Sequence, residues 1–329
     1  MPTDPLPNAE LHLHLEGTLE PELLVRIAGR NGVALPTTDV DELRARYVFD
    51  DLQAFLDIYY GNLAVLKTEQ DFYDLASAYL AAARDGGVRR AESFFDPQVH
   101  VGNGVPLEAL MIGYGTAFAD ARAAGQSCDL ILCFLRDLGA EAAEEIFRAA
   151  LPFREHFIGI GLDSAEVGYP PSLFQDVYAM AAAEGLHRVA HAGEEGGPDY
   201  VREALDLLGV ERVDHGIRAM EDPELVRRLA DEQIALTVCP LSNVALRAVP
   251  DLAAHPLPAM LEAGLRVTVS SDDPAYFGGY VENNFAAMRS LGLGDDDLRT
   301  LAANSFDAAF IDDDARTAWK AELAWTSPR

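Results

Sequence analysis

Lysine is almost absent from this sequence. Only Lys67 and Lys320 occur among the 25 basic residues, whereas Asp and Glu together number 54, so the formal net charge is −29 at pH 7. This excess of negative charge argues against binding to nucleic-acid backbones or anionic membranes, because both require clustered cations. It places no restriction on a small neutral substrate in an enclosed pocket.

Cysteines and long apolar runs are also scarce. The three cysteines, Cys128, Cys133 and Cys239, are too few and odd in number for a disulfide framework, which indicates a reducing compartment. No apolar run approaches the roughly 18 residues that a membrane helix requires. The N-terminal residues lack the basic and apolar regions of a signal peptide. We therefore expect a cytoplasmic protein that contacts neither membranes nor nucleic acids.

The sequence has no glycine-rich phosphate loop and no Ser/Gly-rich linker. Because G-x-G-x-x-G follows none of the strand-like runs, a doubly wound open sheet is disfavoured. Eight strand-like runs alternate with helical patterns, which predicts an α/β protein of the (β/α)₈ TIM-barrel type. We interpret residues 1–329 as a single domain of this kind. The predicted strands lie within Ala9–Gly17 and at Arg89–Phe95, Asp129–Leu135, Phe157–Leu162, Arg188–Ala192, Arg212–His215, Ile234–Cys239 and Arg266–Ser270.

Helical patterns fill the long stretch between the first two predicted strands. They lie at Pro21–Arg30, Asp41–Arg46, Leu52–Leu66 and Gln70–Ala83. This helical insert after strand 1 is too long for a simple connection, and we expect it to cover one mouth of the barrel. A last helix is predicted over Ala308–Trp319, on the outside of the barrel.

The segment Ala9–Gly17 carries the first candidate ligands. It reads A-E-L-H-L-H-L-E-G and alternates leucine with polar residues, which is typical of a half-buried strand. His12 and His14 then point to the same side and can converge on one cation. Taken alone, the segment fits two solvent-facing strand histidines equally well.

Three further segments place polar residues at strand ends. They are H-A-G-E from His191, D-H-G from Asp214 and S-S-D-D-P from Ser270. In a barrel they end strands five, six and eight and meet at the carboxyl face, where barrel enzymes build their sites. The predicted ligands for zinc or a similar divalent ion are His12, His14, His191 and Asp272. The remaining histidines, which belong to no such group, are interpreted as structural: His100, His156, His187 and His255.

The residues beside these ligands suit hydrolysis. A water on such a metal has its pKa lowered to about 7, and Glu194, His215 and Asp273 are candidates for the general acid and base. Neither Lys67 nor Lys320 lies on a predicted strand, where a carboxylated lysine would bridge two ions, so a single metal is favoured. The H-E-x-x-H and G-x-S-x-G motifs of other hydrolases are absent.

These motifs together resemble a known family. The set H-L-H-L-E-G, H-A-G-E-E, D-H-G, V-C-P-L-S-N and S-S-D-D-P is similar to that of the adenosine/adenine deaminases of the amidohydrolase superfamily, from about Glu10 to about Phe310. The resemblance implies a (β/α)₈ barrel with one zinc ion, although Fe²⁺ or Mn²⁺ is not excluded. The implied ligands are His12, His14, His191 and Asp272. It also implies that Glu194 passes a proton to purine N1, that His215 orients and deprotonates the water, and that Asp273 contacts the water and purine N7.

Two positions bear on which purine is the substrate. Nucleoside enzymes of this family usually carry Asp where Glu16 stands and A-G-D-E on strand four, whereas strand four here reads G-L-D-S-A-E from Gly161. The resemblance is therefore closer to the adenine deaminase branch, which acts in purine salvage on the free base and sometimes on N6-substituted adenines. We hypothesise that Glu16 and Ser164 contact the N3/N9 edge of the base.

Other functions and assemblies stay open at this point. The main alternative is deamination of adenosine or of a larger 6-aminopurine nucleoside. A catalytically silent purine sensor is a remote alternative, because all four ligand positions, Glu194 and His215 are present. The expected partner is a small-molecule purine, and a homo-oligomer is neither predicted nor excluded.

The Glu16 hypothesis makes a direct prediction. Replacing Glu16 with Asp shortens the side chain by one methylene and should lower adenine turnover, measured as ammonia release. Turnover equal to that of the unmodified protein would refute the assignment.

Overall fold

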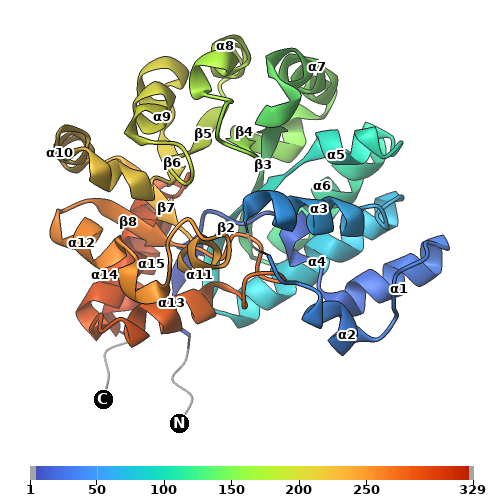
Figure 1. The fold of residues 1–329 in the computed structure, drawn as a ribbon, viewed down its shortest axis with the longest axis horizontal. Helices are drawn as coiled ribbons and strands as arrows, with labels where there is room; N and C mark the ends of the chain where they lie inside the picture. Colours follow the sequence, from blue (N-terminus) through green and yellow to red (C-terminus); the bar gives the residue numbers. More distant parts are fainter. Residues whose placement is uncertain (1–4, 50, 326–329) are drawn as a thin grey trace.

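Eight parallel strands form one sheet in sequence order in the computed structural model, which describes residues 5–49 and 51–325; the outermost ends of the proposed 1–329 domain lie outside these ranges. The strands are β1 (Asn8–Glu10), β2 (Val88–Phe95), β3 (Ser127–Leu135), β4 (Phe157–Asp163), β5 (His187–Ala192), β6 (Arg212–His215), β7 (Ala235–Val238) and β8 (Arg266–Val269). A parallel bridge between Leu13 and Asp272 joins the two ends of the sheet. The predicted (β/α)₈ barrel is thereby confirmed (Figure 1).

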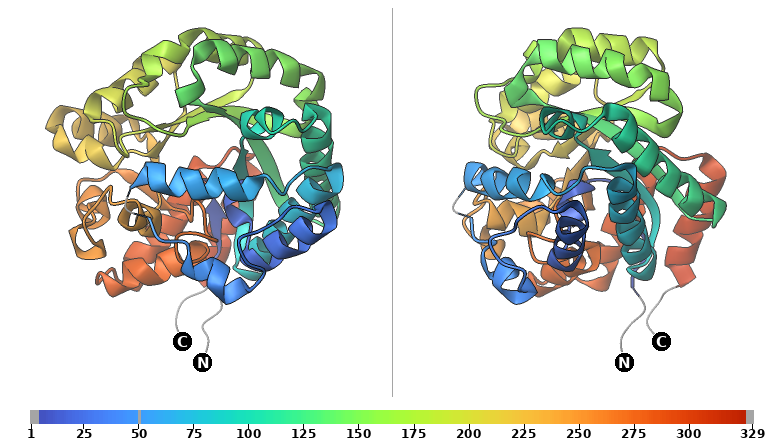
Figure 2. Two further views of the ribbon diagram at one scale, coloured as in Figure 1. Left: turned by 45° about the vertical axis from the view of Figure 1, so that its right-hand side comes forward. Right: turned by 90° about the vertical axis from the view of Figure 1, so that its right-hand side faces the viewer.

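Helices form the outer layer of the barrel (Figures 1 and 2). Between β1 and β2 lie α1 (Pro21–Asn31), α2 (Val40–Ala45), α3 (Leu52–Leu63) and α4 (Glu69–Asp85). The later helices are α5 (Pro97–Gly102), α6 (Leu107–Ala123), α7 (Ala140–Ala150), α8 (Gln175–Ala183), α9 (Pro198–Glu203), α10 (Pro223–Glu232), α11 (Pro240–Ala245), α12 (Leu257–Glu262), α13 (Val281–Ser290), α14 (Asp295–Ala308) and α15 (Asp313–Trp325). Among the described residues, no helix combines the length and apolarity needed to cross a membrane.

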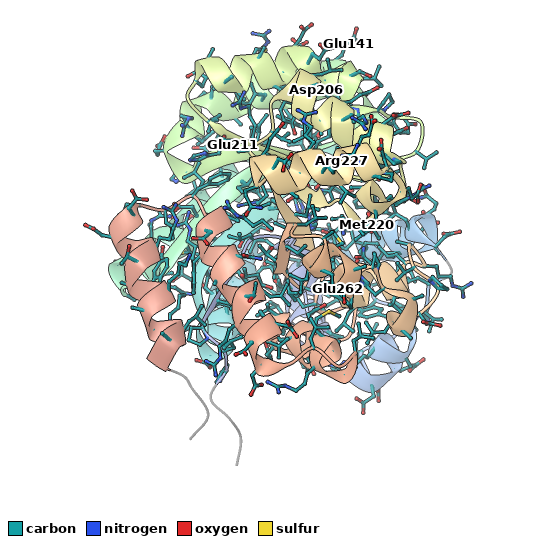
Figure 3. All side chains as sticks on the ribbon, turned by 90° about the vertical axis from the view of Figure 1, so that its left-hand side faces the viewer. Glu141, Asp206, Glu211, Met220, Arg227 and Glu262 are labelled. Carbon is teal, nitrogen blue, oxygen red and sulfur yellow. The ribbon has the colours of Figure 1, made fainter. Side chains whose placement is uncertain are left out.

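The outer faces of these helices are charged. Glu141 on α7, Arg227 on α10 and Glu262 on α12 are exposed and project away from the barrel, as Figure 3 shows. The apolar faces pack inward against the strands, where residues such as Phe147 and Leu229 are fully buried. This division is the amphipathic pattern from which the helices were predicted.

Two predicted elements differ from the structure by more than a shift of a few residues at their ends. The helix predicted over Ala308–Trp319 is divided, because α14 runs through Ala308 and α15 begins only at Asp313. The Asp312 carboxylate accepts a hydrogen bond from the Ala315 amide at 2.8 Å, so this side chain caps the start of α15. The first strand is also shorter than predicted and ends at Glu10.

The shorter first strand changes how its histidines are held. Beyond Glu10 the chain makes only single bridges, from Leu13 to Asp272 and from His14 to Phe94. The His14 amide donates to the Asp272 carbonyl at 3.0 Å, and the Asp272 amide donates to the His12 carbonyl at 3.1 Å. The chain after β1 therefore lies between β2 and the end of β8, and it carries both histidines into the barrel mouth.

The interior of the barrel contains a buried ion network. Glu92 on β2, which is fully buried, pairs with Arg90 at 3.0 Å and with Arg212 at the start of β6 at 2.7 Å. The same carboxylate accepts a hydrogen bond from the Phe310 amide at 2.6 Å. This network links β2, β6 and the chain between α14 and α15.

Removal of the Glu92 charge should therefore destabilise the barrel. Because the buried Arg212 guanidinium loses its closest carboxylate and Arg90 keeps only that of Asp129, Glu92→Gln should lower the free energy of unfolding by about 3–5 kcal/mol. Urea denaturation measures the difference. The control is Glu322→Gln, which breaks the partly exposed pair with Arg89 and should cost less than about 1 kcal/mol. Equal losses in the two variants would contradict a special role for the buried network.

Candidate metal centre and active site

Three histidines and one aspartate converge at the carboxyl ends of the strands. The candidate ligand atoms of His12, His14, His191 and Asp272 all lie within 4.8 Å of one another. The Nε2 atoms of His14 and His191 are 3.2 Å apart, and the Asp272 Oδ1 atom is 3.4 Å from His12 Nε2. The four residues predicted as ligands thus lie together, although they come from three separate parts of the chain.

The surroundings of His12 direct one nitrogen toward this centre. Its Nδ1 atom lies 3.0 Å from the Thr237 carbonyl oxygen, which can only accept, so Nδ1 carries the proton. The Nε2 atom then presents a lone pair, and it is buried without a hydrogen-bond partner among the described residues. The Thr237 hydroxyl donates to Asp214 at 2.8 Å, which fixes the position of this support.

His14 and His191 are arranged in the same way. Their Nδ1 atoms face Asp163 at 3.5 Å and Asp214 at 3.7 Å respectively. Burial lowers the pKa of His14 to about 4 and that of His191 well below its usual value, so both rings are neutral. With protons on Nδ1, two Nε2 lone pairs face each other across 3.2 Å, and a shared cation would remove that repulsion.

Asp272 completes a donor set that fits a divalent metal. Burial alone would raise its pKa, but the neighbouring imidazoles of His12, His215 and His14 outweigh that effect and hold the pKa well below the usual range. Three imidazoles and one carboxylate are ligands that suit zinc and similar ions. Asp272 has φ of +65°, and this left-handed backbone, uncommon outside glycine, turns the chain at the end of β8.

Glu194 is positioned by a second glutamate. The Glu166 carboxylate accepts hydrogen bonds from the backbone amides of Gly193 at 2.6 Å, Glu194 at 3.1 Å, Glu195 at 2.8 Å and Gly196 at 2.8 Å. The loop after β5 is therefore held by one side chain from the loop after β4. Sequence reasoning did not give Glu166 this role, because a single glutamate after a strand carries no spacing signal.

The Glu194 carboxyl group faces His215 inside the barrel mouth. Its Oε2 atom lies 3.5 Å from His215 Nε2. Burial raises its pKa well above the usual value, and the negative charges of Asp272 and Glu166 add to that effect. This shift favours the protonated form of Glu194, from which the carboxyl group can donate a proton, as a general acid must.

Asp273 is packed against Gly17, and of the twenty residue types only glycine, which has no Cβ, leaves room for the Asp273 carboxylate. A Cβ atom on Gly17 would lie 2.0 Å from Asp273 Oδ1. The Ala275 amide donates to the Gly17 carbonyl at 3.0 Å, so the backbones of the two segments are also joined. Burial and then the charge of Asp272 raise the pKa of Asp273 well above the usual value.

A cavity lies over these groups. On one side α3 contributes Leu52, Phe55, Leu56, Tyr59 and Tyr60, joined by Leu135 and Leu246. The polar residues that line it are His14, Asp96, Asp163, Ser164, His191, Glu194, His215, Asp272 and Asp273. Most predicted site residues therefore line one cavity, and α3 lies across its mouth (Figures 1 and 2).

Ser164 and Glu16, the two residues predicted to read the base edge, are placed differently. Ser164 lines the cavity, has φ of +68°, and lies 3.3 Å from the Tyr60 hydroxyl on α3. Glu16 is fully buried and does not line the cavity as described. The hydrogen bonds that hold its Oε1 atom come from the Asp96 amide, His100 Nε2 and the Tyr114 hydroxyl, at 3.3, 3.1 and 3.1 Å. These donors hold the Oε1 atom, whereas the Oε2 atom is buried with no hydrogen-bond partner among the described residues. The contact between Glu16 and the base edge therefore stays a prediction.

Asp96 and Asp163 are two cavity residues to which sequence reasoning assigned no role. Both are buried, and burial raises the pKa of Asp163 to about 7 and that of Asp96 well above its usual value. The carboxylate of each repels the other, so one shared proton relieves the pair. Their positions at the ends of β2 and β4 are the available signal, since polar residues at the carboxyl ends of barrel strands point to a site.

A family model agrees with this geometry. The model described as "Adenosine deaminase" matches residues 7–324. This chain belongs to the adenosine deaminase family. Among curated relatives, the adenine deaminase of Streptomyces coelicolor is 61% identical over 94% of this chain and 92% of its own. The adenine deaminase of Rhodospirillum rubrum is 57% identical over 97% of this chain and 95% of its own.

Solved structures of the family have the same fold. The crystal structure of an adenine deaminase from Arthrobacter aurescens has a TM-score of 0.95 and 54% identity, covering 97% of this chain and 98% of that one. An amidohydrolase from Burkholderia ambifaria, solved with bound Zn, has a TM-score of 0.89 and 33% identity, covering 97% of this chain and 90% of that one. As a family of metal-dependent deaminases would require, the four candidate ligands in this chain are complete.

The close approach of Gly17 to Asp273 gives a sharp test. Gly17→Ala should displace the Asp273 carboxylate and lower kcat for ammonia release from adenine by about 10²-fold, because small misplacements of reacting groups are costly. The control is Gly29→Ala on α1, where an added Cβ meets nothing within 4 Å and activity should not change. Full activity of the Gly17 variant would show that the position of Asp273 is unimportant.

Proposed function

We propose that this protein catalyses the hydrolytic deamination of adenine to hypoxanthine and ammonia, as an aminohydrolase of purine salvage. The observation that carries the proposal is the convergence of His12, His14, His191 and Asp272, with Glu194 beside them, at a cavity that all of these residues except His12 line. The names of the closely similar relatives supply the substrate. The single-domain interpretation of residues 1–329 belongs to the same proposal.

The four converging residues are proposed to hold one zinc ion, and Fe²⁺ and Mn²⁺ are the alternatives. Support comes from the three-imidazole and one-carboxylate donor set and from the neighbouring structure that was solved with bound Zn. When bound, such an ion lowers the pKa of a water molecule to about 7 and so supplies a nucleophile at neutral pH. Thr237, Asp163 and Asp214 keep the proton of each imidazole on the nitrogen that faces away from the ion.

The remaining residues act on the purine. Glu194, in its protonated form, donates its proton to N1 of the base and makes C6 more open to attack by water. Asp273 contacts N7 and the water, and the raised pKa of its carboxyl group allows it to donate to N7. His215 orients the water against C6. The water oxygen forms a bond to C6, and the bond from C6 to the amino nitrogen breaks. One proton of the water converts the amino group to ammonia, and the other replaces the proton that Glu194 gave to N1.

The wall of the cavity is proposed to favour the free base. Ser164 contacts the edge of the base opposite the reacting carbon, and the Tyr60 hydroxyl supports it from α3. Glu16 also acts indirectly in this proposal: it accepts from the Asp96 amide and so positions Asp96, which lines the cavity. Shortening Glu16 then lowers turnover through Asp96 as well as through the predicted contact with the base.

A paired ammonia-release assay tests the function. Metal-loaded protein is supplied separately with adenine and with adenosine, and adenine should be preferred by orders of magnitude. Glu194→Gln should lower kcat on adenine by about 10²–10⁴-fold, because it cannot transfer a proton. The control Glu141→Gln, on the exposed face of α7, should leave kcat within about twofold.

Metal removal separates catalysis from simple purine binding. Protein treated with a chelator should lose activity on adenine and regain it when zinc, Fe²⁺ or Mn²⁺ is added. A preference for adenosine would contradict the substrate assignment while leaving the metal site intact. Full activity of the stripped protein would contradict the metal dependence.

A further inference from the structure

Asn243 joins the active site to a histidine outside it. It belongs to the V-C-P-L-S-N motif, lies on α11 and is fully buried. Its side-chain nitrogen is 3.1 Å from His215 Nδ1, and its side-chain oxygen is 3.3 Å from His255 Nε2. Neither Asn243 nor His255 is among the residues that line the described cavity, so both act through His215.

A backbone amide determines the direction of these hydrogen bonds. The Leu257 amide at the start of α12 lies 3.1 Å from His255 Nδ1 and can only donate, so this nitrogen is unprotonated. Burial lowers the pKa of His255 to about 4, so the ring is neutral at pH 7 and carries its proton on Nε2. That proton requires an acceptor, and the side-chain oxygen of Asn243 is the atom that faces it.

The orientation of the Asn243 amide follows from this constraint. With its oxygen toward His255, its NH₂ group faces His215 Nδ1 and donates to it. Nδ1 therefore holds a lone pair, and a neutral His215 carries its proton on Nε2. This nitrogen faces Glu194 Oε2 at 3.5 Å and Asp272 Oδ2 at 3.8 Å, and its N–H has the Asp272 carboxylate as a nearby acceptor.

We propose that Leu257 N–H, His255 and Asn243 form a directed chain that fixes His215 in its Nε2–H tautomer. His215 then donates a hydrogen bond into the reaction site and does not take the proton of the water at Nε2. This differs from the deprotonating role that the family resemblance implies for His215. The tautomer is independent of the substrate, whereas its effect on catalysis rests on the proposed function.

The tautomer can be measured directly. Long-range ¹H–¹⁵N spectra of the zinc-loaded protein, labelled with ¹⁵N-histidine, report which nitrogen of each ring is protonated. The His215 signals are those that disappear in His215→Gln. We expect protonated Nε2 and unprotonated Nδ1 at pH 7. A protonated Nδ1 on His215 would overturn the proposal.

Asn243→Asp should reverse the hydrogen bond between residue 243 and His215 with almost no change in side-chain size. A carboxylate only accepts, so it should draw a proton onto His215 Nδ1 and invert the tautomer. We expect kcat for adenine to fall by about 10²-fold or more, with KM within about threefold of the unmodified value. An inverted tautomer with unchanged kcat would refute the catalytic consequence, and an unchanged tautomer would refute the chain itself.

A pair of variants at His255 distinguishes its role as a hydrogen-bond donor from its role in packing. The pair also tests the proposal if Asn243→Asp does not fold. His255→Gln keeps an N–H that can donate to Asn243, whereas His255→Leu removes it and leaves the amide free to rotate. We expect the Gln variant to retain the tautomer and kcat within about threefold. The Leu variant should give mixed tautomers and lose about tenfold in kcat, at equal zinc content. Equal behaviour of the two variants would mean that His255 only fills space.

These readouts also distinguish two kinds of failure. If the unmodified protein releases no ammonia from adenine, the proposed function fails, and the spectra still decide whether the chain sets the tautomer. If adenine is deaminated but the spectra show protonated Nδ1, only the chain is refuted.

Discussion

Closure of the barrel between its first and last strands is the interaction on which the site depends. The His14 amide and the His12 carbonyl both hydrogen-bond to the backbone of Asp272, and these bonds join the two ends of the sheet. The same contact brings two imidazoles from the start of the chain against a carboxylate from its last strand. His191 then needs only to follow from β5 for the donor set to be complete.

Because the barrel closes here, several ionisable groups are buried close together. Their neighbours then determine which of their atoms carry protons. Each ligand imidazole has an acceptor behind it, so its lone pair faces inward. The carboxyl groups of Glu194 and Asp273, which are buried beside other acids, have raised pKa values, and this favours their protonated forms. Burial disfavours the charged forms of these side chains, and the resulting pKa shifts favour the protonation states that a deaminase site requires.

The sequence allowed the barrel and the metal ligands to be predicted because both depend on local patterns. Strand runs at regular spacing gave the fold, and His12, His14 and Asp272 stand at strand ends where a barrel gathers them. The positioning groups lacked such a signal. Glu166 acts through four backbone amides of a loop that is distant in sequence, and His255 acts through a side chain and a main-chain amide. No spacing rule shows such contacts.

Glu16 is held by contacts that its motif does not show. Its place in the first motif suggested a contact with the base, and the structure adds that His100 and Tyr114, from other elements, hold its Oε1 atom. The roles of side chains near a site are decided by which donors fold against them. That information is distributed over the chain and is not contained in any one motif.

The contact between Gly17 and Asp273 has a consequence for the divergence of related sequences. An added Cβ at position 17 and the carboxylate at position 273 cannot occupy the same space. The Asp273 Cα atom would also lie 2.6 Å from that Cβ, so a smaller side chain at position 273 does not by itself make room, and any side chain at position 17 requires a different backbone path after β8. A relative with alanine at the first and aspartate at the second would need a shifted backbone, so this pair marks which members of the family share the local geometry seen here.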